Sequence, residues 1–229
     1  MKKILNILFF VIAISITNNS FSQNLNWENL KPENKHLLNI NLGWDYGLVV
    51  GLGYGYQLNT KLPVVLNITY SGPMGENLID DYKFEIGGQI RLLKYQDFAF
   101  TADMHGVFRR YENPMVSMLN FGSDVSGVIG YYKPGWFVAG EVGFDKAIVS
   151  HFNHSDIYKD YTYDDVKDGW YEPAAAGNFY YGLQTGFSVK QNDITLALGR
   201  VIAEDFKTTP LIPYYGRLGF NMKINDGNN

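Results

Sequence analysis

The densest group of side chains that could do chemistry lies between residues 151 and 168. It combines two histidines with five acidic residues: His151, His154, Asp156, Asp160, Asp164, Asp165 and Asp168. Oxygen-rich clusters can hold calcium, and paired histidines can hold zinc. The spacing matches neither the glycine-punctuated calcium loop nor the helical HExxH frame of zinc proteases. We therefore expect an acidic, solvated loop that holds no metal and no cofactor.

A second set of charged residues is spread along the chain, at positions that alternate with apolar ones. The alternation places all of them on one face of successive strands: Asp45, Lys83, Glu85, Arg91, Asp103, His105, Arg109, Asp124, Glu141, Asp145 and Arg217. Their signs nearly balance. If these side chains are enclosed, they form either a structural ion-pair network or the lining of a narrow channel, and buried charges must be paired in both cases.

The elements that carry these residues are predicted to be β-strands, because apolar side chains recur with a period of two. The last strand shows the pattern best: Leu218, Phe220, Met222 and Ile224 alternate with Arg217, Gly219, Asn221 and Lys223. The glycines at 51, 53 and 55 follow the same parity on a strand, where they relieve crowding, and no helix follows them to make a dinucleotide site. The chain is thus predicted to be all-β, with about ten strands and with eight or twelve as alternatives.

The N-terminal residues indicate export. A basic start, Met1-Lys2-Lys3, precedes an apolar run from Ile4 to Ile14 that is too short to span a bilayer comfortably. Small residues at Ser20 and Ser22 then predict cleavage after Ser22. Residues 1–22 are therefore expected to be a cleaved signal peptide.

The mature chain is predicted to hold one domain. The strands span residues 36–225, preceded by a polar periplasmic leader at 23–35 and followed by a C-terminal tail at 226–229. An unanchored terminus is usually mobile, so we expect the leader to be a flexible tail and not a plug.

Composition excludes several classes of function. The chain has no cysteine, which rules out disulfides, thiolate metal sites, a cysteine nucleophile and a lipoprotein anchor. Its net charge of −4 and the lack of a basic face argue against nucleic acid as a partner. Its 24 glycines, 17 tyrosines and 15 phenylalanines are typical of membrane β-barrels.

Two patterns separate a membrane barrel from a soluble one. Tight polar turns alternate with longer connections, as expected when one barrel end faces the periplasm and the other the exterior. Aromatic residues border both ends of the strands, with aliphatic residues between them. The even strand number and closed sheet follow, because every backbone group within hydrocarbon must be paired.

The C-terminal segment Arg217-Leu218-Gly219-Phe220-Asn221-Met222-Lys223-Ile224 resembles the assembly signal of outer-membrane β-barrels. Its polar residue, glycine and alternate hydrophobics correspond to Arg217, Gly219, Met222 and Ile224, although five residues follow them. The whole mature chain resembles the small outer-membrane β-barrel superfamily at the level of pattern. The resemblance implies an integral outer-membrane location, with lipid, lipopolysaccharide and the barrel-assembly machinery as partners.

The residues leave three functions open. We favour a non-enzymatic structural or accessory subunit of an envelope complex, because a connection of about 30 residues with many aromatics suits contact with a partner, including other outer-membrane proteins. The candidate contact residues are His151, His154, Trp170 and Tyr171. The alternative is a narrow pore for ions or small solutes. The third is an outer-leaflet lipid hydrolase, for which His151 or His154 would act with Ser150 or Ser155.

Overall fold

The computed structural model describes residues 23–44, 47–74, 81–161, 166–173 and 177–226. The predicted signal peptide (1–22), Asp45 and the last three residues of the predicted tail lie outside the described residues. No helix within the described ranges is both long and apolar enough to cross a membrane.

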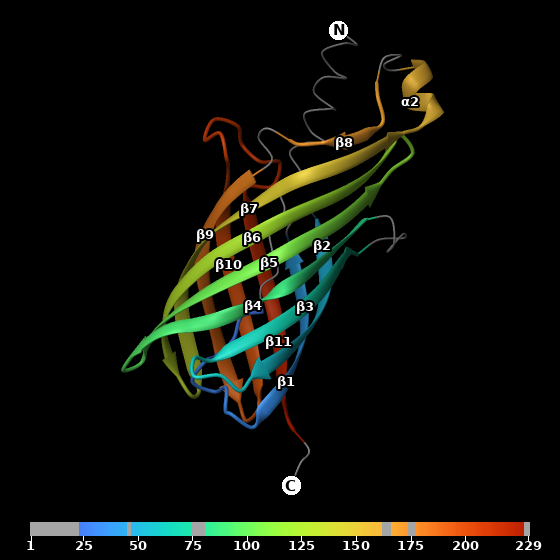
Figure 1. Ribbon diagram of the computed structural model, residues 1–229. Helices are drawn as coiled ribbons and strands as arrows, with labels where there is room; N and C mark the ends of the chain where they lie inside the picture. The colour runs from blue at the N-terminus through green and yellow to red at the C-terminus, as the bar shows by residue number, and fades with distance from the viewer. Residues whose placement is uncertain (1–22, 45–46, 75–80, 162–165, 174–176, 227–229) are drawn as a thin grey trace.

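Ten long strands form one closed antiparallel barrel (Figure 1). Each strand pairs with its neighbour along the chain, and β1 pairs with β11 to close the ring. The strands are β1 (Asn34–Trp44), β2 (Leu48–Leu58), β3 (Val64–Pro73), β4 (Asp81–Tyr95), β5 (Phe98–Glu112), β6 (Val116–Lys133), β7 (Trp136–His154), β9 (Gly177–Val189), β10 (Asn192–Ala203) and β11 (Tyr214–Asn225). The prediction of a closed barrel of about ten strands is confirmed.

Burial alternates along the strands in the sense that a membrane requires. On β1, the outward side chains of Leu38, Ile40 and Leu42 are 39–56% exposed, whereas Asn39 and Asn41 between them are at most 5% exposed. The other strands follow the same rule, with aliphatic and aromatic residues outside and polar residues inside. An apolar exterior around a polar lumen is the arrangement of small outer-membrane β-barrels, so the predicted resemblance is confirmed at the level of the fold.

The two ends of the barrel differ as the turn pattern predicted. At the turn end, β4 and β5, β6 and β7, and β9 and β10 are joined by two residues each. At the loop end lies the long connection between β7 and β9, which contains α2 (Asp156–Tyr161) and β8 (Gly169–Tyr171). β1 begins and β11 ends at the turn end, so residue 226 lies there, whereas residue 23 is buried inside the lumen.

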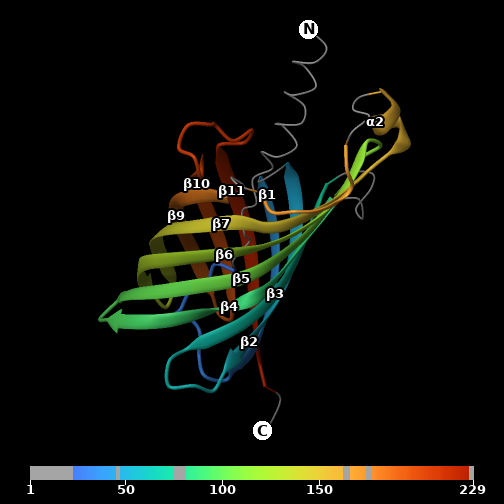
Figure 2. The same cartoon turned by 45° about the horizontal axis from the view of Figure 1, so that its top comes forward.

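The described residues that follow Ile148 do not form a simple connecting loop, because they include the end of β7, α2 and β8. β7 continues to His154, and β8 pairs with it through Ser150, His151 and Phe152. The long β6–β7 hairpin and β8 therefore extend the barrel wall beyond the loop-end edge of β1 (Figure 2). Sequence reasoning ended β7 too early, because the parity of its outward residues shifts at a β-bulge facing Phe121 and Gly122.

Candidate functional site

The lumen holds the charged residues that the sequence assigned to it. Nine of the predicted residues are buried there: Lys83, Glu85, Asp103, His105, Arg109, Asp124, Glu141, Asp145 and Arg217. Arg91 lies near the turn end and is partly exposed. Asp45 lies outside the described residues.

Cations on β4 and β5 are paired at the loop end of the lumen. Lys83 Nζ lies 3.5 Å from Glu85 Oε1, with both side chains at most 2% exposed. Arg109 donates hydrogen bonds to both carboxylate oxygens of Asp81, at 3.1 and 3.2 Å. Asp81 was not among the predicted residues, since it begins its strand and follows a second aspartate.

Carboxylates on β6 and β7 accept hydrogen bonds from neutral side chains on β9 and β11. Tyr180 donates its hydroxyl to Asp124 at 3.0 Å. Glu141 accepts hydrogen bonds from Gln184 and Tyr215. These bonds tie β6 and β7 to β9 and β11 and hold the lumen side chains in one arrangement, which is what a structural network requires.

The leader enters the lumen from the turn end, so the expectation of a flexible tail is wrong. The side chains from Gln23 to Trp27 are at most 5% exposed. The backbone carbonyl of Gln23 accepts a hydrogen bond from Gln89 at 2.7 Å, and that of Asn24 accepts one from Asn221 at 2.7 Å. Residues 23–30, which we call the plug, are thus held by strands on opposite sides of the barrel.

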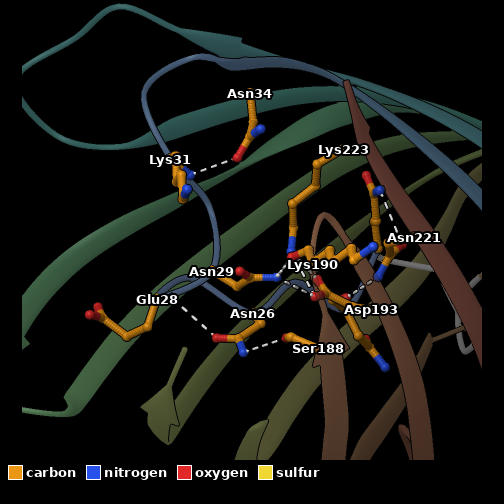
Figure 3. Close-up of polar contacts among 12 residues, drawn as sticks. Asn26, Glu28, Asn29, Lys31, Asn34, Ser188, Lys190, Asp193, Asn221 and Lys223 are labelled. Atoms are coloured by element: carbon orange, nitrogen blue, oxygen red, sulfur yellow. Dashed lines mark hydrogen bonds and ion pairs between the residues drawn. The ribbon is translucent and has the colours of Figure 1, made fainter. Parts of the chain in front are cut away.

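Asparagine side chains of the plug bind the turns that close this end. Asn26 donates hydrogen bonds to the carbonyl oxygen of Lys133 at 2.9 Å and to the Ser188 hydroxyl at 2.8 Å. Asn29 donates to Asp193 at 3.0 Å, and Asp193 also pairs with Lys223 at 2.6 Å (Figure 3). The plug is therefore anchored to the β6–β7 turn and to β9 and β10.

Apolar side chains seal the lumen around the plug. Leu25 and Trp27 form a buried cluster with inward residues of five strands, namely Leu37, Val65, Ala99, Val128, Tyr132, Phe137 and Ala139. The Arg91 guanidinium lies 5.9 Å from the centre of the Trp27 ring, and Glu28 pairs with Arg91 at 3.2 Å and with Lys94 at 2.6 Å. This apolar layer lies between the polar lumen and the turns at this end of the barrel.

The sequence carries a signal for this layer that the alternation argument passed over. At the turn end, several strands are apolar on both faces, as in Val64-Val65-Leu66 and Trp136-Phe137-Val138-Ala139. Inward apolar residues on several strands of a polar lumen need an apolar partner, and the leader supplies Leu25 and Trp27.

The predicted contact residues at the loop end come together on the β7–β8 wall. His151 packs against Trp170 with ring centres 4.9 Å apart, and Phe152 packs against Tyr171 at 5.8 Å. Trp170 is 59% exposed and Tyr171 is 43% exposed, so both retain surface for a partner.

His154, one of the two histidines of the hydrolase hypothesis, has an acidic partner. His154 Nδ1 lies 2.9 Å from Asp168, whose second oxygen accepts a hydrogen bond from Lys159 at 2.6 Å. The Ser155 hydroxyl accepts from the first turn of α2, and the buried Ser150 hydroxyl accepts from Asn120. Among the described residues, no hydrogen bond joins His154 to either serine.

No group of three or more metal-ligating side chains occurs in the described part of the chain. The residues of the assembly signal lie on β11, the seam strand that pairs with both β1 and β10. Met222 and Ile224 face outward, Arg217 faces the lumen, and Gly219 lies opposite Asn41 and Thr195. Their recognition by the assembly machinery remains a prediction.

No protein-family model and no curated protein matches the chain. Similar solved structures include a KdgM porin in complex with disordered oligogalacturonate, at 8% identity and a TM-score of 0.42, covering 82% of this chain and 99% of that one. The CymD monoaromatic hydrocarbon channel follows at 7% identity and 0.33, covering 85% and 90%. LpxR from Salmonella typhimurium has 11% identity and 0.30, covering 86% and 78%.

Proposed function

We propose that the protein is an integral outer-membrane β-barrel with a closed lumen, acting as a non-enzymatic structural or accessory subunit of an envelope assembly. The observation that carries the proposal is the plug, since Leu25 and Trp27 seal the turn end with an apolar layer. An apolar seal across a narrow lumen opposes the passage of ions and polar solutes. Export by the signal peptide, cleavage after Ser22 and insertion by the barrel-assembly machinery form part of the proposal.

The proposed contact surface is the β7–β8 wall at the loop end. Trp170 and Tyr171 present exposed aromatic surface there, and aromatic residues are enriched in the cores of protein interfaces. The backing of Trp170 by His151 and Phe121 holds it in place before a partner binds, which reduces the entropy lost on binding.

Conductance tests the closed lumen directly. The mature chain, beginning at Gln23, is reconstituted in planar bilayers beside a variant that lacks residues 23–30. We expect the complete chain to be silent across salt concentrations. Steady conductance of the complete chain, at the level of the deletion variant, would overturn the closed lumen.

A gated pore is the second candidate, favoured by the polar lining of the lumen above the plug. Asn41, Asn67, Thr69 and Gln184 all face inward there, beside the charged residues. A gated pore predicts that deletion of residues 23–30 produces conductance and that a natural signal displaces the plug. Silence of a correctly folded deletion variant would reject this candidate.

Co-purification tests the accessory role. The tagged protein is extracted gently from its native envelope, and the accompanying proteins are compared with those of a Trp170→Ala, Tyr171→Ala variant. Phe187→Ala, an outward change on the lipid-facing wall, is the matched control. Loss of a stoichiometric partner from the double variant alone supports the role, and a lone monomer in both cases argues against it.

The same preparation tests the hydrolase hypothesis. Release of fatty acid from outer-membrane lipid, abolished by His154→Ala, would reject the non-enzymatic assignment. Unchanged lipid in the presence of the native protein would support it.

A further inference from the structure

Arg200 is a charged residue on the lipid-facing wall. On β10, the side chains of Ile194, Leu196 and Leu198 face outward and are 41–55% exposed, and Arg200 continues this face. Its neighbour Val201 is 1% exposed and faces the lumen. The pairing of β10 with β9 and with β11 runs through Arg200 without a register shift, so no bulge turns its side chain inward.

Two other outward cations on strands near the loop end have carboxylate partners. Arg110 pairs with Glu112, and Lys146 Nζ lies 2.6 Å from Glu204. Arg200, by contrast, has no hydrogen bond or ion pair with any described residue, although it is exposed. Its charge is therefore not neutralised by the described part of the chain.

Nearby carboxylates on the chain are already engaged. The second carboxylate oxygen of Glu204 accepts a hydrogen bond from the Gly177 amide at 3.1 Å. Asp205 accepts from the amides of Lys207 and Thr208, both at 2.9 Å, and these bonds lower the pKa of its carboxyl. An anion for Arg200 must therefore come from outside the described residues.

The position of Arg200 matches the headgroup level of the membrane. Eight residues separate it from Asn192 at the turn end, which corresponds to about 20 Å along the barrel axis at about 3.3 Å per residue and about 40° of tilt. The apolar band of such barrels is about 25 Å tall, so the backbone of Arg200 lies near its upper edge, and the long side chain can extend to the headgroups. Arg200 pairs directly with Tyr181 on β9 and with Tyr214 on β11, and all three side chains lie on the outward face. Tyrosines at this level are typical of the aromatic belt of a membrane protein.

We propose that Arg200, flanked by Tyr181 and Tyr214, forms a binding site for a phosphate group of the outer-leaflet lipid. A guanidinium matches phosphate oxygens with two parallel hydrogen bonds, and side chains on directly paired positions are close enough for a tyrosine hydroxyl to donate to the same phosphate. The site rests on the proposed orientation, with the loop end toward the exterior. It does not depend on whether the barrel is an accessory subunit or a pore.

Native mass spectrometry of the detergent-solubilised mature chain tests the site. The probes are lipid A carrying both phosphates and lipid A from which they have been removed. Arg200→Gln removes the charge, and Arg110→Gln is the matched control, because Arg110 also faces outward near the loop end but is paired. Circular dichroism and thermal unfolding verify that both variants retain the barrel.

We expect the native chain and Arg110→Gln to bind phosphorylated lipid A equally and Arg200→Gln to bind it about tenfold more weakly, equivalent to about 1.4 kcal/mol. Dephosphorylated lipid A should bind all three proteins as weakly as Arg200→Gln binds the phosphorylated form. Equal binding of phosphorylated lipid A by Arg200→Gln and the native chain would overturn the proposal. Full displacement of the lipid by millimolar inorganic phosphate would also overturn it, because the site would then hold a free anion.

Discussion

Trp27→Ala is expected to release the plug from the lumen. Trp27 is 4% exposed inside an apolar cluster, and truncating a buried tryptophan to alanine costs about 3–5 kcal/mol. The Arg91 guanidinium near its ring adds about 0.5–2 kcal/mol. The strands keep their own pairing, so the loss acts mainly on the equilibrium between docked and undocked plug. At about 1.4 kcal/mol for each factor of ten, the undocked population rises at least about a hundredfold.

Cysteine labelling measures that equilibrium without interference, because the chain has no cysteine of its own. A single cysteine replaces Asn24, which is 5% exposed in the lumen, and its reaction with a water-soluble maleimide is followed in detergent micelles. We expect slow labelling with Trp27 present and labelling faster by about two orders of magnitude with Trp27→Ala, as the population estimate requires. Trp136→Ala, an outward change at the same barrel end, is the control and should leave the rate unchanged. Equal rates for Trp27→Ala and its parent would refute the reasoning.

Three further changes test other parts of the structure. Lys223 and Asp193 form an ion pair in which both side chains are 0% exposed, and Lys223→Met leaves Asp193 without its cation. The free energy of unfolding by guanidinium should fall by about 3–5 kcal/mol, and adding Asp193→Leu should restore most of it. At Gly55, a Cβ atom would lie 3.1 Å from both the Gln23 amide oxygen and Val65 Cγ1, so Gly55→Val should crowd the apolar layer around the plug and speed labelling in the lumen, with a smaller fall in the thermal midpoint of the barrel. The hydrogen bond from Lys159 lowers the pKa of Asp168, so this contact is complete above pH 3.8 and is lost as the pH falls through the lowered pKa. Carbon-13 titration of the Asp168 carboxyl should give a midpoint below 3.8, and this midpoint should rise in Lys159→Met.

The barrel wall could be predicted from sequence because its information is local. Each strand repeats the same two-residue alternation, and a one-residue slip would move every apolar side chain from lipid to lumen. The outward positions of Leu218, Phe220, Met222 and Ile224, and the inward position of Arg217, follow from that constraint. The lumen set followed from the same parity, since choosing the apolar face for lipid leaves the charged residues inside.

The partners within the lumen could not be predicted in the same way. Tyr180 reaches Asp124 across 56 residues of sequence, and Asn26 reaches Ser188 across 162. Such pairs depend on the stagger of the strands and on where the leader lies in the lumen. Alternation fixes the face on which a side chain lies but leaves its partner on another strand undetermined.

The sequence did not predict the plug, because the polar composition of the leader was taken to indicate a solvated segment. The segment Gln23-Asn24-Leu25-Asn26-Trp27 has the composition of a solvated tail, yet amides are suited to the end of a lumen, where turn carbonyls and strand side chains need donors and acceptors. Asn26 meets the Lys133 carbonyl, and Asn221 meets the Asn24 carbonyl. The two apolar residues between the amides fill the space that the inward apolar residues of five strands leave. In a polar lumen, an asparagine-rich leader with an occasional large apolar residue is thus complementary to its surroundings, and composition alone does not distinguish it from a disordered one.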